Sequence, residues 1–134
     1  MNTQTAVIGN QNETSKGLNI TLWVIQIGAA AMFLMAGANK LSGNEQMVGM
    51  FQAIGFGQWF RYLTGSLEII GGVLLLVPSL SGIGGLLMTG VFTGAVATHL
   101  FIIGGNPTMA IVLLAASAFI AWGRRDRILK LIGR

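Results

Sequence analysis

The sequence predicts an all-α membrane protein, a bundle of four transmembrane helices with a short interfacial helix between helices 1 and 2. Of its 134 residues, 53% are hydrophobic and only 9% are charged, against about 25% charged in a typical soluble domain. No charged residue lies between Lys16 and Lys40, or between Glu68 and Arg124. These long uncharged stretches exclude an ordinary soluble globule, a disordered chain and a coiled coil. At about 20 apolar residues per crossing, four crossings fit into one membrane domain.

The first predicted span covers residues 18–38 and follows a polar N-terminal tail, residues 1–17. Its apolar stretch is longer than the roughly 7–15 residues typical of a signal peptide. We therefore expect it to be retained as a membrane helix. Trp23 lies near one predicted membrane interface, and Lys40 near the other, where its stem can extend toward the headgroups.

The segment 41–59 is predicted to lie on the membrane surface. Its apolar residues recur at helical spacing from Met47 to Ile54, but the segment is too short and too polar to span. Gly55 follows this pattern and is expected to end the short helix.

Three further spans are predicted at 60–77, 83–103 and 108–122, separated by breaker residues. Pro78 ends the first of these, and the sequence Gly-Gly-Asn-Pro at 104–107 separates the other two. The basic C-terminal tail, residues 124–134, is predicted to form a short amphipathic helix. Basic residues beside a span favour the cytoplasmic side, so we expect both termini in the cytoplasm and the protein in the bacterial cytoplasmic (inner) membrane.

Glycine is abundant, with 20 residues in the chain, and predicts close helix packing. Because lipid is as apolar as leucine, membrane helices associate where small residues let their backbones approach. Gly65 and Gly72 lie on one face of the second span, and Gly90 and Gly94 form a GxxxG pair in the third. We predict that these four glycines contact neighbouring helices in a tight bundle.

Glu68 is the candidate functional residue that the sequence singles out most clearly. A carboxyl group at membrane depth costs a few kcal/mol, so it is expected to face the bundle interior, either protonated or paired. Two interpretations stay open: a hydrogen-bonding tie between helices, or a group that carries protons or holds a polar headgroup. Arg61 shares its helix face, but a separation of about 10 Å along the axis favours a bridge through water or another helix.

His99 and Lys40 are expected near the same outer half of the membrane as Glu68. His99 is the single histidine and either contacts Glu68 or bonds a backbone carbonyl; Lys40 either joins this polar cluster or extends to the headgroups. One histidine and one carboxylate do not make a metal site. Since cysteine is absent, thiolate and Fe–S ligation are excluded, and no metal, haem or Fe–S ligation is expected.

Three strings carry a resemblance to a known family: MAGANKL at 35–41, RYLTGSLEIIGGVLLLVP at 61–78 and THLFIIGGNP at 98–107. They resemble the DoxX-like family of small four-helix bacterial membrane proteins. The resemblance implies a four-helix bundle in the cytoplasmic membrane, and relatives that include subunits of a thiosulfate:quinone oxidoreductase. The positions that carry over are Lys40, Arg61, Glu68 and His99, none with an established catalytic role.

Three functions remain open from the sequence, and none makes the chain an enzyme on its own. The first is a non-catalytic accessory or scaffold subunit of a larger membrane assembly, for example a redox assembly. The second is a quinone-interacting component of a membrane oxidoreductase that uses Glu68 and His99, with quinone as the candidate cofactor. The third is a small proton-coupled transporter with Glu68 as the coupling carboxyl. The expected partners are membrane lipids and other membrane subunits or further copies of the chain. Nucleic acid is not expected, because the excess basic charge lies in the tail beside a span.

Overall fold

The computed structural model describes residues 15–133 and is helical throughout this range, without a β-strand. Most of the polar tail expected at 1–17 lies outside the described residues. The elements in order are α2 (Lys16–Ser42), α3 (Glu45–Ile54), α4 (Trp59–Leu76), the 3-10 turn η1 (Pro78–Leu80), α5 (Ser81–Thr98), the π-helical turn η2 (His99–Ile103), α6 (Thr108–Gly123) and α7 (Arg125–Leu131).

Helix α2 is longer at both ends than the predicted span 18–38. At its start, the Ser15 side chain accepts a hydrogen bond from the Leu18 backbone N–H at 3.2 Å, which is a standard N-cap. At its end, Gly43 adopts a left-handed conformation with φ 77°, which only glycine takes without strain. Both caps supply partners for backbone groups that the terminal turns of a helix leave unpaired.

Three helical segments are long and apolar enough to cross a membrane: α2, α4, and η1 through η2 (Pro78–Ile103). A fourth crossing exists if α6 and α7, which meet at an angle of 61°, together count as one span. Helix α6 alone has 16 residues, shorter than the usual span of about 20. The structure thus supports three to four membrane-spanning helices.

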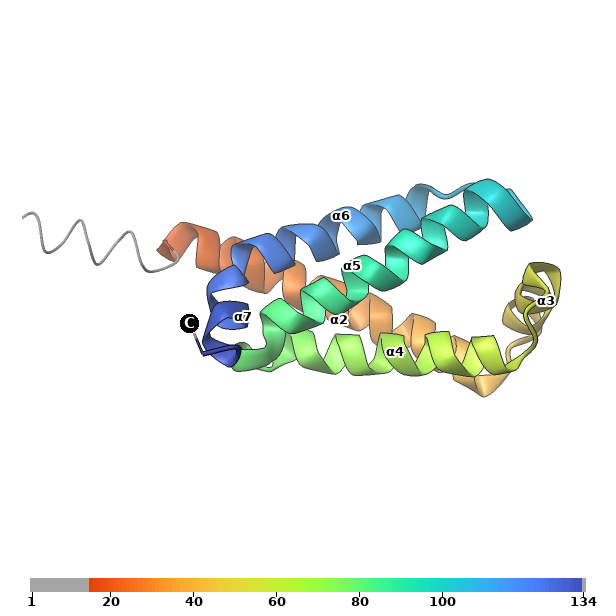
Figure 1. Ribbon diagram of the computed structural model, residues 1–134, viewed down its shortest axis with the longest axis horizontal. Coiled ribbons are helices and arrows are strands. Elements are labelled where there is room, and N and C mark those ends of the chain that lie inside the picture. The colour runs from red at the N-terminus through yellow and green to blue at the C-terminus, as the bar shows by residue number, and fades with distance from the viewer. Residues whose placement is uncertain (1–14, 134) are drawn as a thin grey trace, which may run out of the picture.

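The bundle consists of two helix pairs, α2 with α4 and α5 with α6 (Figure 1). The pairs meet near α7 and diverge toward α3, which lies across the wider end of the bundle (Figure 1). Apolar side chains from both pairs form the core, in which the rings of Phe33 and Phe92 stack with their centroids 5.2 Å apart. The divergence of the two pairs is what leaves room for a cavity near α3.

Glycines make the close contacts between the helices. Gly65 and Gly72 both lie against α2, since a methyl group added to either would approach α2 atoms to 3.0–3.2 Å. Other close-contact glycines carried no clear signal in the sequence: an added methyl at Gly71 would collide with Met88, and one at Gly123 with Leu22. Small residues at these points allow the short backbone distances that membrane helices require.

The prediction that Gly90 and Gly94 pack against a neighbouring helix of the bundle is wrong. A methyl group added at either position would meet no heavy atom within 4 Å. The physical reason is the divergence of the helix pairs, because both glycines lie beyond the tight α4–α5 contact between Gly71 and Met88. A GxxxG pattern brings helices together only where the facing helix is close.

The basic C-terminal segment, predicted as a short amphipathic helix, also contributes a buried side chain to the bundle. The Arg124 side chain is fully buried; its Nε donates to Gln26 Oε1 at 2.7 Å and its Nη1 to Asn19 Oδ1 at 2.8 Å. Gln26 Nε2 in turn donates to the Leu75 carbonyl at 2.8 Å. This polar network ties α2, α4 and the end of α6 together at the narrow end of the bundle.

Candidate functional site

A cavity of about 650 Å³ lies between the two helix pairs, on the side covered by α3. Helix α4 contributes a stripe of residues at helical spacing, from Phe60 to Glu68, and α5 contributes a second stripe from Leu87 to Thr98. Lys40 of α2 and His99 of η2 complete the polar part of the lining. The remaining lining is almost entirely apolar, and it comes mainly from α3, α5 and α6.

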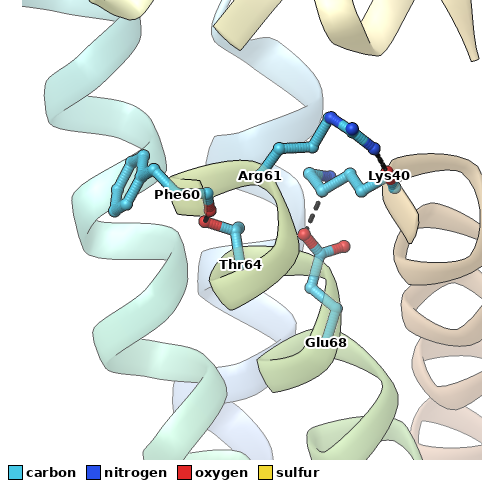
Figure 2. A network of polar contacts seen from close by, with 5 residues as sticks. All are labelled: Lys40, Phe60, Arg61, Thr64 and Glu68. Carbon is cyan, nitrogen blue, oxygen red and sulfur yellow. Dashed lines mark hydrogen bonds and ion pairs between the residues drawn. The ribbon is translucent and has the colours of Figure 1, made fainter. Parts of the chain in front are cut away.

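Glu68 is the polar centre of this cavity. Its side chain is only 2% exposed, and its Oε1 accepts a charged hydrogen bond from Lys40 Nζ at 2.8 Å (Figure 2). Its second oxygen, Oε2, is buried and has no hydrogen-bond partner in the described part of the chain. Buried carboxylate oxygens are nearly always paired, because leaving one unpaired loses its hydration without replacement. A ligand in the adjoining cavity that donates a hydrogen bond would supply the missing partner once the Glu68 carboxyl turns toward it.

Lys40 forms this ion pair from the last turns of α2, and its side chain is 15% exposed. Of the two roles considered for Lys40, the structure shows the one inside the polar cluster. Its ammonium group has three N–H donors, and the ion pair uses one of them. The Lys40–Glu68 pair thus presents both hydrogen-bond donors and an acceptor to the same cavity.

Arg61 lies beside this pair but does not bind Glu68. Its Nη1 donates to the Lys40 carbonyl (Figure 2). Its Nε donates to Gln58 Oε1 at 2.8 Å, and its guanidinium lies 4.4 Å from the centroid of the Tyr62 ring. The Lys40 carbonyl also accepts from the Gly43 backbone N–H at 3.4 Å, and the added Arg61 bond holds the Lys40 backbone in place. Lys40 thus forms the expected bridge through another helix, because its carbonyl accepts from Arg61 and its Nζ donates to Glu68.

His99 lines the same cavity but is separate from the ion pair. Its Nδ1 lies 3.1 Å from the Gly104 carbonyl oxygen, so this nitrogen carries the hydrogen in the bonded tautomer. No hydrogen bond joins His99 to Glu68 among the residues that the structure describes. His99 also begins the π-helical turn η2, and such turns are frequent at functional sites.

Helix α3 supplies the part of the site that the sequence did not indicate. Met47, Met50, Phe51 and Ile54 line the cavity, and Phe51 and Ile54 are buried. Helical spacing revealed this apolar face, and we assigned it to the membrane surface. Which part of the bundle this apolar face covers depends on how α3 folds back over the wider end.

Between residues 15 and 133, no cluster of three or more histidine, cysteine or acidic residues has the arrangement of a metal site. The polar groups of the cavity are one ammonium, one carboxylate, one imidazole and the hydroxyls of Thr64 and Thr98, in a largely apolar surround. These groups suit a neutral organic molecule with polar atoms on one end.

The family model described as "DoxX-like family" matches residues 24–123. Among curated proteins, the chain is similar to the Bacillus subtilis (strain 168) protein named "Putative oxidoreductase CatD", with 27% identity over 84 residues. That match covers 63% of this chain and 63% of the relative, so the alignment spans less than two thirds of the relative's length. No solved structure matches the chain.

Proposed function

The chain belongs to the DoxX-like family, and from that premise we propose that it is a quinone-binding accessory subunit of a larger membrane redox assembly. It crosses the bacterial cytoplasmic membrane four times, with both termini in the cytoplasm. Its contribution is to hold the quinone headgroup; the electrons come from another subunit. The oxidoreductase name of the Bacillus subtilis relative supports a redox setting.

The observation that carries this proposal is the Lys40–Glu68 pair, with one unpartnered carboxylate oxygen, beside an apolar cavity of about 650 Å³. Ligand pockets are commonly about 300–1,000 Å³ and mostly apolar, with a few placed polar groups. A quinone carbonyl accepts a hydrogen bond, and the Lys40 ammonium donates one. A hydroquinone hydroxyl donates, and Glu68 Oε2 accepts. The pair therefore suits both oxidation states of the headgroup.

The proposed topology follows from the charges. Arg125, Arg127 and Lys130 lie in α7, and basic residues next to a span favour the cytoplasmic side. The wider end of the bundle and the cavity then lie toward the outer leaflet, and α3 lies at the outer interface. Trp59 is 62% exposed beside α3, in keeping with the preference of tryptophan for membrane interfaces.

An assembly is part of the proposal because the chain offers few ligands for electron carriers. It has no cysteine and one histidine, whereas Fe–S clusters require thiolate or histidine ligands. The partner subunits therefore supply the electron path. Purification in mild detergent tests this part: a stoichiometric redox partner is expected, and a lone monomer would contradict it.

The binding test is a titration of ubiquinone-1 into the full chain in lipid nanodiscs. Glu68→Gln and Lys40→Met are expected to weaken binding about tenfold each, which corresponds to one charge-assisted hydrogen bond of about 1.5–3 kcal/mol. Glu45→Gln is the matched control, since Glu45 is exposed and lies outside the cavity. Unchanged binding in both cavity variants would overturn the assignment.

One observation favours a second candidate, a proton-coupled transporter. A buried carboxyl that pairs with a lysine can exchange that partner for a proton or a cationic substrate. Liposomes containing the protein would then take up substrate in response to a pH gradient, and Glu68→Gln would abolish the response. Uptake that is indifferent to the pH gradient rules this candidate out.

A further inference from the structure

The cavity opens to the outside of the bundle at residues that both line it and are exposed. Four lining residues meet this condition: Leu63 of α4, Gly90 and Gly94 of α5, and Met109 of α6. The Leu63 side chain is 44% exposed. Three of the four belong to α4 and α5, so the cavity opens mainly between these two helices.

The two ends of the cavity are closed. At the wider end of the bundle, Phe51 and Ile54 of α3 are buried over the cavity. At the opposite end, Phe92 lines the cavity and stacks on Phe33, and below it Gly71 and Met88 bring α4 and α5 into direct contact. An apolar helix therefore separates the cavity from the outer aqueous side, and close packing seals it from the inner side.

Gly90 and Gly94 leave the gap between α4 and α5 open. They lie one helical turn apart, on the same face of α5. The contact of Gly71 with Met88 and of Gly84 with Leu74 sets the register of the two antiparallel helices. In this register Gly90 and Gly94 lie near the level of Glu68 and its preceding turn. Because neither glycine packs against another helix within the chain, their missing side chains leave space beside the ion pair.

The geometry points to a lateral portal, formed by Leu63, Gly90 and Gly94, through which a ring-bearing lipid-soluble ligand enters the cavity from the bilayer. Its headgroup reaches the carboxyl of Glu68, whose Oε2 is buried and unpartnered, once that carboxyl turns toward the cavity, and its apolar tail stays in the portal. The identity of the ligand as a quinone rests on the proposed function. The portal itself rests on the exposure and packing of its three residues.

The first test does not use a quinone. The full chain in lipid vesicles is exposed to a small aryl diazirine that partitions into the bilayer, and carbene labelling is mapped by mass spectrometry. Labelling of Phe92 and Leu113, which line the cavity and are each only 7% exposed, is expected in the unsubstituted protein. Gly94→Leu and Gly90→Leu place a side chain in the portal and should abolish it. Gly28→Leu is the control, because Gly28 also has open space around it but lies outside the cavity.

Met109→Trp tests the competing entrance, since Met109 is 56% exposed and lies at the start of α6. Labelling that survives in the Gly90 and Gly94 variants, or that is lost in Met109→Trp instead, overturns the portal. An absence of labelling of Phe92 and Leu113 in the unsubstituted protein also overturns it.

Quinone titration separates this inference from the proposed function. Ubiquinone-1 has a tail of one isoprenoid unit. If the portal holds this tail, Gly94→Leu weakens ubiquinone-1 binding about tenfold, because the tail then buries roughly two fewer methylene groups. Binding of tailless ubiquinone-0 to Gly94→Leu should change little. An equal loss of affinity for the two quinones would mean that the leucine fills the headgroup space, and this result would contradict the portal. Portal-dependent labelling in a protein that binds neither quinone would refute the proposed function and leave the portal in place.

Discussion

Removing Lys40 is expected to destabilise the protein more than removing the charge of its partner. Lys40→Met leaves the Glu68 carboxylate, 2% exposed, without its one ion-pair partner. Removing one member of a buried pair typically costs about 3–5 kcal/mol, because the remaining charge is desolvated and unpaired. Glu68→Gln should cost only about 1–2 kcal/mol, since the longer, partly exposed Lys40 side chain can turn toward water or headgroups.

The double variant Lys40→Met with Glu68→Leu gives the sharper test. Apolar replacement of both members of a buried pair is often neutral, so the double variant should be more stable than Lys40→Met alone. The assay is reversible unfolding in mixed detergent micelles followed by circular dichroism, with Glu45→Gln as the exposed control. Additive losses, with the double variant compared with Lys40→Met and Glu68→Leu alone, would refute an energetically coupled pair. Equal losses in Lys40→Met and Glu68→Gln would refute the expected asymmetry.

Three further predictions follow from the packing and the polar network. Gly71→Ala should destabilise the bundle by about 1–3 kcal/mol through overpacking against Met88, whereas Gly90→Ala should be neutral or stabilising by up to about 1 kcal/mol; thermal melts that rank the two the other way would contradict the open space at Gly90. Arg124→Met removes two buried charged hydrogen bonds and should cost about 3 kcal/mol or more, while Arg125→Met, on the exposed side of α7, should change the unfolding free energy by less than about 0.5 kcal/mol. Arg61→Met should weaken quinone binding without removing a cavity group, because Arg61 holds the Lys40 carbonyl. Arg61→Lys keeps a hydrogen-bond donor and should restore binding. Circular dichroism of both variants distinguishes this positioning role from a general loss of folding.

Much of the architecture could be predicted from hydropathy and breaker residues. The long apolar stretches indicated the helices α2, α4, α5 and α6, and Pro78 and the Gly-Gly-Asn-Pro turn marked their ends. Helical spacing also indicated α3. Helix ends were less predictable, because the N-cap of Ser15 and the Arg61 bond to the Lys40 carbonyl extend α2 beyond its apolar stretch.

Four site candidates could be named from the sequence, but the contacts between them could not. Lys40, Glu68 and His99 line the cavity, and Arg61 lies beside the ion pair. Glu68 binds Lys40, Arg61 binds the Lys40 carbonyl and Gln58, and His99 lies within hydrogen-bond distance of the Gly104 carbonyl. Whether residues on different helices come into contact depends on the rotation of each helix about its axis and on the angle at which the helices cross. Arg124 shows the same limit, since nothing in a run of basic residues distinguishes the one that is buried.

Composition and hydropathy are enough to identify a membrane protein of few charges, and to require a partner for the carboxyl of Glu68, because an unpaired charge at membrane depth is costly. Which cation is that partner, which glycines pack, and that α3 covers a cavity are known from the three-dimensional arrangement of the helices. Hydropathy and helical periodicity are properties of one segment at a time, because each depends only on residues that are close together in the sequence. Whether two helices touch at Gly71 or stand apart at Gly90 depends on the angle at which the two helix pairs diverge, which is fixed by the sum of contacts along the whole bundle.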